Sequence, residues 1–380
     1  MTDNTPAVPM DTIEAAQITC TVYHPMTRRA LAAMQALGVR SYHMEPGRAV
    51  VLKRRTAILG LGAGITLEEE PADRILFHVM RADAEPAIQA IVAACELNIP
   101  GRGSVVSEDV DITRPSVWEP YPLTPVPGTT HIETEVDLAN VICTVQRGRG
   151  DNIVKAVLGL GVPMPVVTTG EGTGLREKLG LIRIALPAGK DVVHAVVSEH
   201  EATDILGALV DSGRLDQLGS GFIFESPLAR GVINSMVIRG QRHSASIEQI
   251  IAAVDDLVGS SHWRKRTVGD DDPARKHRYL RDLMSLTVIC NEGHALELVH
   301  AATQAGAGGA TISRLSHAGR EAEGIVVSPA REITELIVDR AVAPYVARAL
   351  SDGGVYDAQV AGFIVCKPVT VACTHRSANR

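Results

Sequence analysis

The pattern of apolar and polar residues repeats three times along this chain. Each copy begins with an apolar, β-branched run, followed by a short turn, a stretch with apolar residues at helical spacing, and a Gly. The runs are residues 18–22, 141–145 and 286–290, and the closing glycines are Gly38, Gly161 and Gly306. The spacing is the same in all three copies, and an internal repeat of this kind constrains the fold more strongly than any single residue.

The remainder of each copy predicts a second strand, a third strand, a second helix and a fourth strand. The third apolar runs are residues 74–80, 191–197 and 332–338. They are rich in β-branched residues and partly alternate, as expected of strands covered on one face. The last part of the second copy, 213–227, aligns with 354–368 of the third, with Gly, Asp, Gly-Phe-Ile and Pro in register.

Each copy therefore has the order β-α-β-β-α-β, the ferredoxin-like arrangement. Helices cover one face of such a sheet, so the other face needs cover, which neighbouring copies can supply. We expect an α+β protein in which three tandem ferredoxin-like units form an intramolecular pseudo-trimer. The expected units are 14–112, 137–235 and 283–375, separated by a Pro-rich linker, 113–136, and by a linker with a helix, 236–282.

Composition argues against several classes of function. Aromatic residues make up 3% of the chain and the formal net charge is −7, whereas nucleic-acid binding favours stacking platforms and basic grooves. Most of the six Cys lie in apolar strands without a CxxC motif, which favours buried reduced thiols over disulfides or a metal site. The N-terminus lacks the apolar core of a signal peptide, and no apolar run is long enough to span a bilayer. We expect a cytoplasmic protein that is not inserted in a membrane, binds no nucleic acid and has no metal site.

The most suggestive chemistry lies in a Gly-rich stretch after the second strand of the middle copy. It reads Gly170-Glu171-Gly172-Thr173-Gly174, and Arg176 and Lys178 follow. Closely spaced glycines let backbone N–H groups converge on an anion, while the hydroxyl and the two cations add donors and charge. A tight hairpin that needs positive φ explains the glycines equally well. A second loop of the same copy, Gly219-Ser220-Gly221, also precedes a strand and favours the anion site.

The middle copy, about residues 138–235, resembles the nitrogen regulatory PII family. The matching features are the Gly-Arg-Gly-Asp opening of its first helix at 148–151, the loop at 170–174, and residues 213–216 with 219–224. The third copy is similar through residues 306–312, and the first copy through its spacing. The resemblance implies a trimer of ferredoxin-like units that binds adenine nucleotides in the clefts between units and moves a long loop against a partner.

The resemblance also implies positions for the site. By position, residues 170–174 would be the base of the mobile loop, 219–221 the phosphate-side loop, and Arg230 a basic position after the fourth strand. Phe222 stands where the family usually places Lys, and the third copy has Val360-Ala361-Gly362 in place of two glycines. In the family the mobile loop faces the phosphate-side loop of the next unit, so the partner loop would be 360–362 or Gly101-Arg102-Gly103. The implied ligand is ATP, ADP or AMP, with Mg.

We therefore predict a signalling protein that binds an adenine nucleotide or another small anionic effector between repeats and controls a transporter or a metabolic enzyme. An enzyme, such as a hydrolase with its active site in a diverged cleft, is the main alternative, and a structural adaptor without a ligand is a third. Histidines are the candidate catalytic residues of this alternative, and we expect His78 and His194 at matching places on the third strands. Of the thirteen histidines, His243, His294, His300 and His317 lie elsewhere. No HExxH, GxSxG or CxxC motif organises them.

Overall fold

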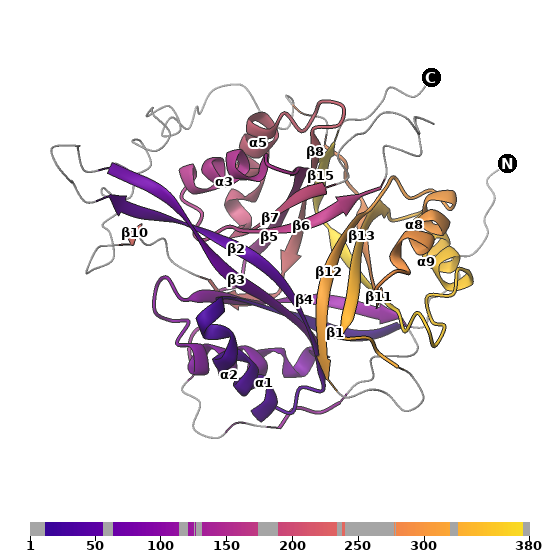
Figure 1. Ribbon diagram of the computed structural model, residues 1–380, viewed down its shortest axis with the longest axis horizontal. Helices are drawn as coiled ribbons and strands as arrows, with labels where there is room; N and C mark the ends of the chain where they lie inside the picture. Colours follow the sequence, from indigo (N-terminus) through magenta and orange to yellow (C-terminus); the bar gives the residue numbers. More distant parts are fainter. Residues whose placement is uncertain are drawn as a thin grey trace.

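A computed structural model describes residues 12–55, 64–113, 121–124, 126, 131–173, 189–233, 238–239, 277, 279–319 and 326–374. Strands from all parts of the chain occupy the centre, and helices lie outside them in three pairs, α1 with α2, α3 with α5, and α8 with α9 (Figure 1). The predicted α+β class is confirmed. Within the described ranges, no helix is both long and apolar enough to cross a membrane.

Three stretches of the chain follow the order βαββαβ. The first contains β1 (Thr12–Tyr23), α1 (Thr27–Ala36), β2 (Ser41–Arg55), β3 (Gly64–Met80), α2 (Ala84–Cys95) and β4 (Gly103–Thr113). The second contains β5 (Leu138–Gln146), α3 (Gly150–Gly159), β6 (Val166–Gly172), β7 (Gly189–Ser198), α5 (Glu199–Gly213) and β8 (Gly221–Leu228). The third contains β11 (Leu283–Asn291), α8 (Ala295–Gln304), β12 (Thr311–Gly319), β13 (Ala330–Asp339), α9 (Ala343–Asp352) and β14 (Phe363–Val369). We call these stretches the first, second and third segments.

The strands of each segment are hydrogen-bonded in the same antiparallel order. The orders are β2-β3-β1-β4, β6-β7-β5-β8 and β12-β13-β11-β14. The first strand is therefore central in every segment, and the second and fourth strands are the edges. This is the strand order of a ferredoxin-like unit.

Alternation along the central strands separates two environments. On β5, Val141, Cys143 and Val145 are buried with the apolar residues of α3 and α5, whereas Asn140 and Ile142 point to the interior of the molecule. Burying one Val side chain stabilises the fold by roughly 1.5–3 kcal/mol. A slip of one residue would exchange the two faces, so this alternation fixes the register of the strand.

A carboxylate on the third strand of each segment caps the first helix of that segment. Asp191 Oδ2 accepts hydrogen bonds from the backbone N–H groups of Gly148 at 2.7 Å and Gly150 at 3.0 Å. Glu332 Oε2 does the same for Gly293 and Ala295, both at 3.0 Å, and Asp73 accepts from the Thr27 hydroxyl. In the second and third segments, these carboxylates supply acceptors for backbone N–H groups at the start of the helix that have no partner inside it. They explain Gly150, because a Cβ there would lie 2.9 Å from the Asp191 carboxylate.

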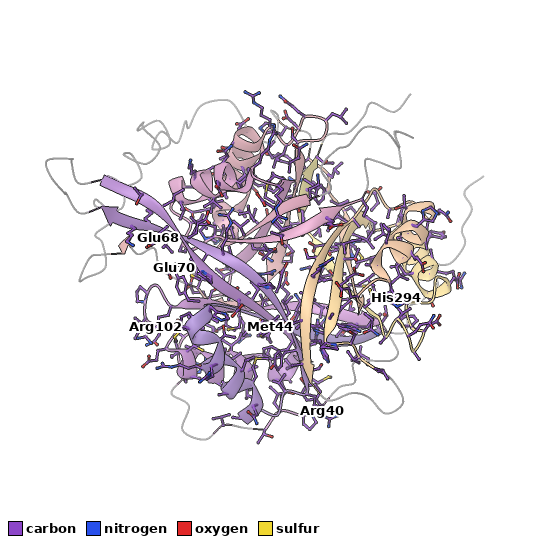
Figure 2. All side chains as sticks on the ribbon, viewed as in Figure 1. Arg40, Met44, Glu68, Glu70, Arg102 and His294 are labelled. Atoms are coloured by element: carbon purple, nitrogen blue, oxygen red, sulfur yellow. The ribbon has the colours of Figure 1, made fainter. Side chains whose placement is uncertain are left out.

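The segments join along both edges of their sheets. The second strands pair with one another, β2 with β6, β6 with β12, and β12 with β2 at Met44 (Figure 2). At the other edge, β9 (Arg230–Val232) follows the second segment and pairs with β4 of the first. Similarly, β15 (Val371–Thr374) follows the third segment and pairs with β8 of the second, and the end of β4 pairs with β14. Each segment therefore touches the other two.

Strands β2 and β3 continue beyond the body of the molecule as a two-stranded arm, which carries Glu68 and Glu70 (Figures 1 and 2). The base of the arm lies on the second segment. Val50 and Leu52 are buried in its apolar core, and Arg48 forms an ion pair with Asp151 in the first turn of α3 at 2.6 Å. The short strand β10 (Ile238–Arg239) runs parallel to β2 beside Leu52.

Candidate functional site

The Gly-rich stretch of the middle segment lies inside the sheet. Gly170 and Glu171 pair with β7 on one side, and Gly170, Glu171 and Gly172 pair with β12 on the other. The Thr173 N–H donates to the Ala310 carbonyl at 3.0 Å. Two-sided pairing leaves few backbone N–H groups for an anion. Gly174, Arg176 and Lys178 lie outside the described residues.

Close packing accounts for the glycine at position 170. Neither Gly170 nor Gly172 has φ in the left-handed region, so the alternative of a turn with positive φ does not hold at these positions. A Cβ on Gly170 would lie 2.9 Å from Ser313 Oγ and 3.0 Å from the Ile312 carbonyl oxygen. Gly170 therefore lets β6 approach β12 closely.

The other predicted site residues lie in two tight turns and on β9. Gly219 and Gly101 have φ of 75° and 87°, and both turns enter a fourth strand. A Cβ on Gly221 would lie 2.4 Å from the Thr144 carbonyl oxygen, and one on Gly103 would lie 2.3 Å from that of Thr21. These glycines therefore serve the close approach of two strands. Ser220 is buried, and its N–H donates to the Gln217 carbonyl at 3.2 Å.

The two predicted loops of the middle segment occupy opposite edges of one sheet. Gly170 pairs with Lys190, Lys190 pairs with Gln146, and the neighbouring Val145 pairs with Gly221. Three strand spacings of about 4.8 Å therefore separate them by roughly 14 Å. Arg230 lies on the first segment and pairs with Glu85 at 2.7 Å, while Arg102 pairs with Glu96.

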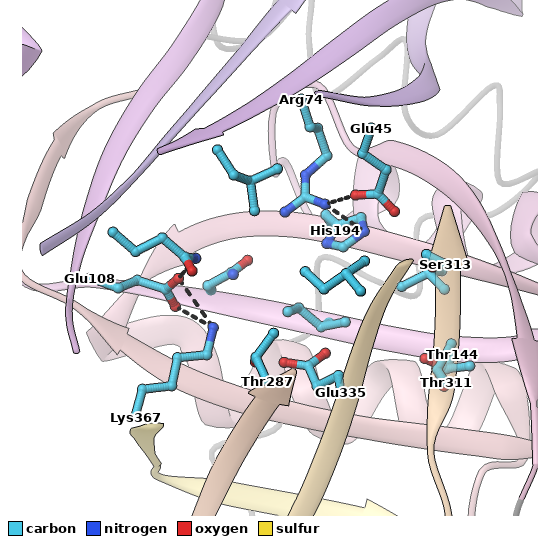
Figure 3. A pocket seen from close by; sticks show the side chains of 16 residues that line it. Glu45, Arg74, Glu108, Thr144, His194, Thr287, Thr311, Ser313, Glu335 and Lys367 are labelled. Atoms are coloured by element: carbon cyan, nitrogen blue, oxygen red, sulfur yellow. Dashed lines mark hydrogen bonds and ion pairs between the residues drawn. The ribbon is translucent and has the colours of Figure 1, made fainter. Parts of the chain in front are cut away.

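The three segments enclose a polar cavity of about 60 Å³ at the centre of the molecule (Figure 3). Its lining comes from the inner faces of all three sheets. The ionisable residues that line it are Glu45, Arg74, Glu108, His194, Glu335 and Lys367. Sequence reasoning did not find this site, because its residues lie on strands that are far apart in the sequence.

The fourth strands of the three segments together contribute a cluster at one side of this cavity. Lys367 Nζ lies 3.0 and 3.1 Å from the two carboxylate oxygens of Glu108. The Ser226 hydroxyl and the Gln17 amide donate to the same carboxylate at 2.9 and 3.0 Å. Burial lowers the pKa of Lys367, but the attraction of Glu108 and Glu335 is stronger in sum and raises it above its usual value. Lys367 is therefore charged at neutral pH.

A second network on the cavity wall joins the first and second segments. Arg74 forms a buried ion pair with Glu45 and lies 3.2 Å from His194 Nε2. Burial, and then the cations Arg74 and Lys367, hold the pKa of His194 well below its usual value. His194 is therefore neutral. Because Arg74 can only donate, Nε2 accepts and the proton resides on Nδ1.

His194 does not have the surroundings of a catalytic base. The Thr168 hydroxyl lies 3.1 Å from His194 Nε2, a contact that could activate a nucleophile, but Thr168 is fully buried. Within the described residues no side chain orients His194 through Nδ1. The predicted match between His78 and His194 is also wrong. Gln17 and Asn140 hold corresponding positions on the first strands, but Gln17 faces His78 whereas Asn140 faces Val196. His78 therefore corresponds to Val196 and not to His194.

A pair of histidines lies where the first and third segments meet. His43 on β2 and His317 on β12 face each other in register, with ring centroids 5.0 Å apart. Their ring nitrogens are buried and have no hydrogen-bond partner within the described residues. Burial and the nearby Arg331 cation lower the pKa of His317 to about 4. Burial, His317, Arg331 and His78 hold the pKa of His43 well below its usual value. In the described part of the chain, no three His, Cys, Asp or Glu side chains are placed to hold a metal ion.

Comparisons with known proteins give distant likenesses. No family model and no curated protein matches this chain. A PII protein of Arabidopsis thaliana, crystallised with citrate, is 17% identical over 30% of this chain and 94% of its own, with a TM-score of 0.19. An aspartate kinase from Synechocystis is 9% identical over 93% of this chain and 43% of its own, with a TM-score of 0.21. Both TM-scores are too low to establish a shared fold, so the fold rests on the strand orders and registers given above.

The close approach at Gly170 gives a prediction with a matched control. Gly170→Ala should lower the free energy of unfolding by roughly 1–3 kcal/mol, because the new Cβ meets the backbone of β12. Gly172→Ala should change it by less than about 0.5 kcal/mol, because the nearest atoms there belong to the flexible Lys190 side chain. Urea unfolding of both variants measures this, and equal losses would contradict the packing argument.

The histidine pair predicts a loss of stability in mild acid. The unfolded chain binds a proton at His317 below about pH 6.5, whereas the folded chain does so only below about pH 4. Stability should therefore be complete above pH 6.5 and fall as the pH decreases toward 4, by up to about 3 kcal/mol for this residue. Chemical unfolding at pH 7.5, 6.0 and 4.5 tests this. His317→Gln should flatten the dependence, whereas the exposed His200→Gln should not; identical profiles for wild type and His317→Gln would refute it.

Proposed function

We propose that this chain is a single-chain regulatory protein of the PII-like type. In this proposal, its segments are three copies of one ferredoxin-like unit arranged around a pseudo-threefold axis. A small effector binds in the space between the units, and its binding changes how the units pack together. A partner then reads that change.

The second strands β2, β6 and β12 pair with one another at three junctions, which we call the seams. The registers of the seams support the pseudo-threefold arrangement. Each seam can be described by one pair of residues that face each other across two second strands. The pairs are Arg48 with Val167, Glu171 with Ile312, and Ser316 with Met44. The three pairs are equivalent to one another. Met44, Val167 and Ile312 are one member of each pair, and each faces the corresponding residue of its own third strand. A cyclic set of equivalent contacts is what a threefold rotation produces.

The observation that carries the function is the central cavity. Its wall contains six ionisable side chains from all three segments. Four of them are buried, and His194 and Glu335 are half-buried; burying charge is costly unless it is paired. An occupant of this space touches every unit at once. Its binding free energy would therefore depend on the relative positions of the units, which is the coupling that a regulatory protein needs.

The size of this cavity limits what it can hold. A volume of about 60 Å³ accommodates roughly four to six water molecules. An adenine nucleotide is much larger. We therefore place the proposed nucleotide, ATP, ADP or AMP with Mg, outside the cavity, beside the paired strands at residues 170–173 and 310–311.

In this proposal, the element that contacts a partner is one whose position depends on how the units pack at the seams. The β2–β3 arm projects beyond the body, and its base is buried against the second segment through Val50 and Leu52. A shift between the first two units would therefore move the arm. We propose this arm, in addition to residues 174–188, as a contact for a transporter or a metabolic enzyme.

Hydrogen exchange with candidate effectors tests the proposal. The probes are ATP, ADP, AMP and cyclic AMP, each with Mg²⁺, and a panel of small carboxylates, amines and inorganic salts. We expect at least one probe to slow exchange in β2, β6 and β12 together, since these strands form the three seams. Arg74→Met should weaken the effect of an interior effector, whereas the exposed Arg29→Met should not. Protection confined to one segment, or no protection by any probe, would refute the regulatory function.

A further inference from the structure

The charges around the central cavity do not balance. Arg74 is paired with Glu45, and Lys367 with Glu108. Glu335 is a third carboxyl group on the same wall, and within the described residues no Lys or Arg forms an ion pair with it. The ionised wall therefore carries two positive and three negative formal charges, which disfavours the small anionic effector that the sequence suggested for the space between units.

Among the described residues, Glu335 is the carboxyl group of this wall that has no ion pair of its own, although Lys367 attracts it. Its Oε1 accepts a hydrogen bond from the Ser285 hydroxyl at 3.2 Å, and its carboxyl group faces the cavity (Figure 3). Burial raises the pKa of Glu335; Glu108 on β4 adds to the rise, while Lys367 on β14, Ser285 on β11 and Arg74 on β3 oppose it. The remaining ionisable groups of the wall are Glu45 on β2 and the neutral His194 on β7.

Uncharged oxygen atoms complete the wall around Glu335. Asn140 and Ser313 are each only 8% exposed and line the cavity, but neither forms a side-chain hydrogen bond within the described part of the chain. Thr144, Thr287 and Thr311 add hydroxyl groups to the same wall. Their side-chain hydrogen bonds therefore go to the contents of the cavity, water or a bound ligand.

We propose that the cavity binds a monovalent cation, with Glu335 as its charged ligand and the Asn140, Ser313 and threonine oxygens as its neutral ligands. Hard cations prefer such oxygen donors. One carboxylate without an ion pair matches a single positive charge. Mg²⁺ and Ca²⁺ sites generally contain more carboxylates or keep several bound waters. K⁺, Na⁺ and ammonium all have this chemistry. The inference rests on the proposed function, because it names the effector class of the same cavity.

A salt-exchange experiment on the whole chain tests this proposal. Thermal unfolding is measured in KCl, NaCl, NH₄Cl and tetramethylammonium chloride at equal ionic strength, because the last cation is too large for the cavity. At least one small cation should raise the midpoint by about 2 °C or more over tetramethylammonium. A proton competes for Glu335, so the rise should be larger at pH 9 than at pH 6.

Two variants and one control assign the effect to the cavity. Glu335→Gln should abolish the difference between cations, and the exposed Glu297→Gln on α8 should preserve it. Ser313→Ala keeps the charge and removes a ligand, so it should raise the cation concentration needed for half of the effect several-fold. It provides the test if Glu335→Gln does not fold. An equal cation effect in wild type and both cavity variants, or none in wild type, would overturn the proposal.

The same data separate this inference from the proposed function. If no small cation stabilises the protein but another probe protects all three seams from hydrogen exchange, the cation assignment fails and the regulatory function stands. If a cation binds and protects one segment alone, the site is real but the regulatory function fails.

Discussion

The fold depends on one buried ion pair in which three parts of the chain meet. Glu108, Ser226 and Lys367 lie on the fourth strands of the three segments and are between 0% and 6% exposed. Removing charges from water costs several kcal/mol per ion, so the pair is tolerated only because the Ser226 and Gln17 donors complete the carboxylate. A shift of the first or third segment would separate the two charges, and a shift of the second would remove the Ser226 donor. The pair therefore specifies how the segments assemble.

In a symmetric trimer, three identical residues would meet at such a place, and three like charges would repel one another. A single chain can place a different residue in each copy. The same freedom is visible at the seams between second strands. Three facing pairs occupy equivalent registers there: Ala49 with Val166, Gly172 with Thr311, and His43 with His317. One of these pairs is apolar, one contains a glycine and one consists of two histidines, so the three junctions differ in chemistry although their registers are equivalent.

The sequence was sufficient for the features that depend on local spacing. The three apolar runs and their closing glycines predicted the element order, because alternation and helical periodicity are local properties. The caps could not be predicted: Asp191 bonds Gly148 and Gly150, about forty residues away. The role of an individual glycine likewise could not be predicted from the sequence. Gly170 suggested an anion site, but its neighbour across the seam, Ser313, explains it through packing.

The cavity was missed for a related reason. Arg74, Glu335 and Lys367 lie on strands that are far apart in the sequence, and Lys367 pairs with Glu108 of another segment. Only the three-dimensional pairing of the strands brings them together. The ionisable groups of the cavity wall therefore gather where the segments meet.

The most direct test of the account exchanges the central charges. Glu108→Lys and Lys367→Glu are made singly and together, and the free energy of unfolding is measured by urea titration. Each single variant should lose about 3–5 kcal/mol, because it buries two like charges or an unpaired one. The double variant should recover at least half of the summed loss, since the pair is restored with its direction reversed. Additive losses in the double variant would contradict the claim that these two strands meet through this ion pair.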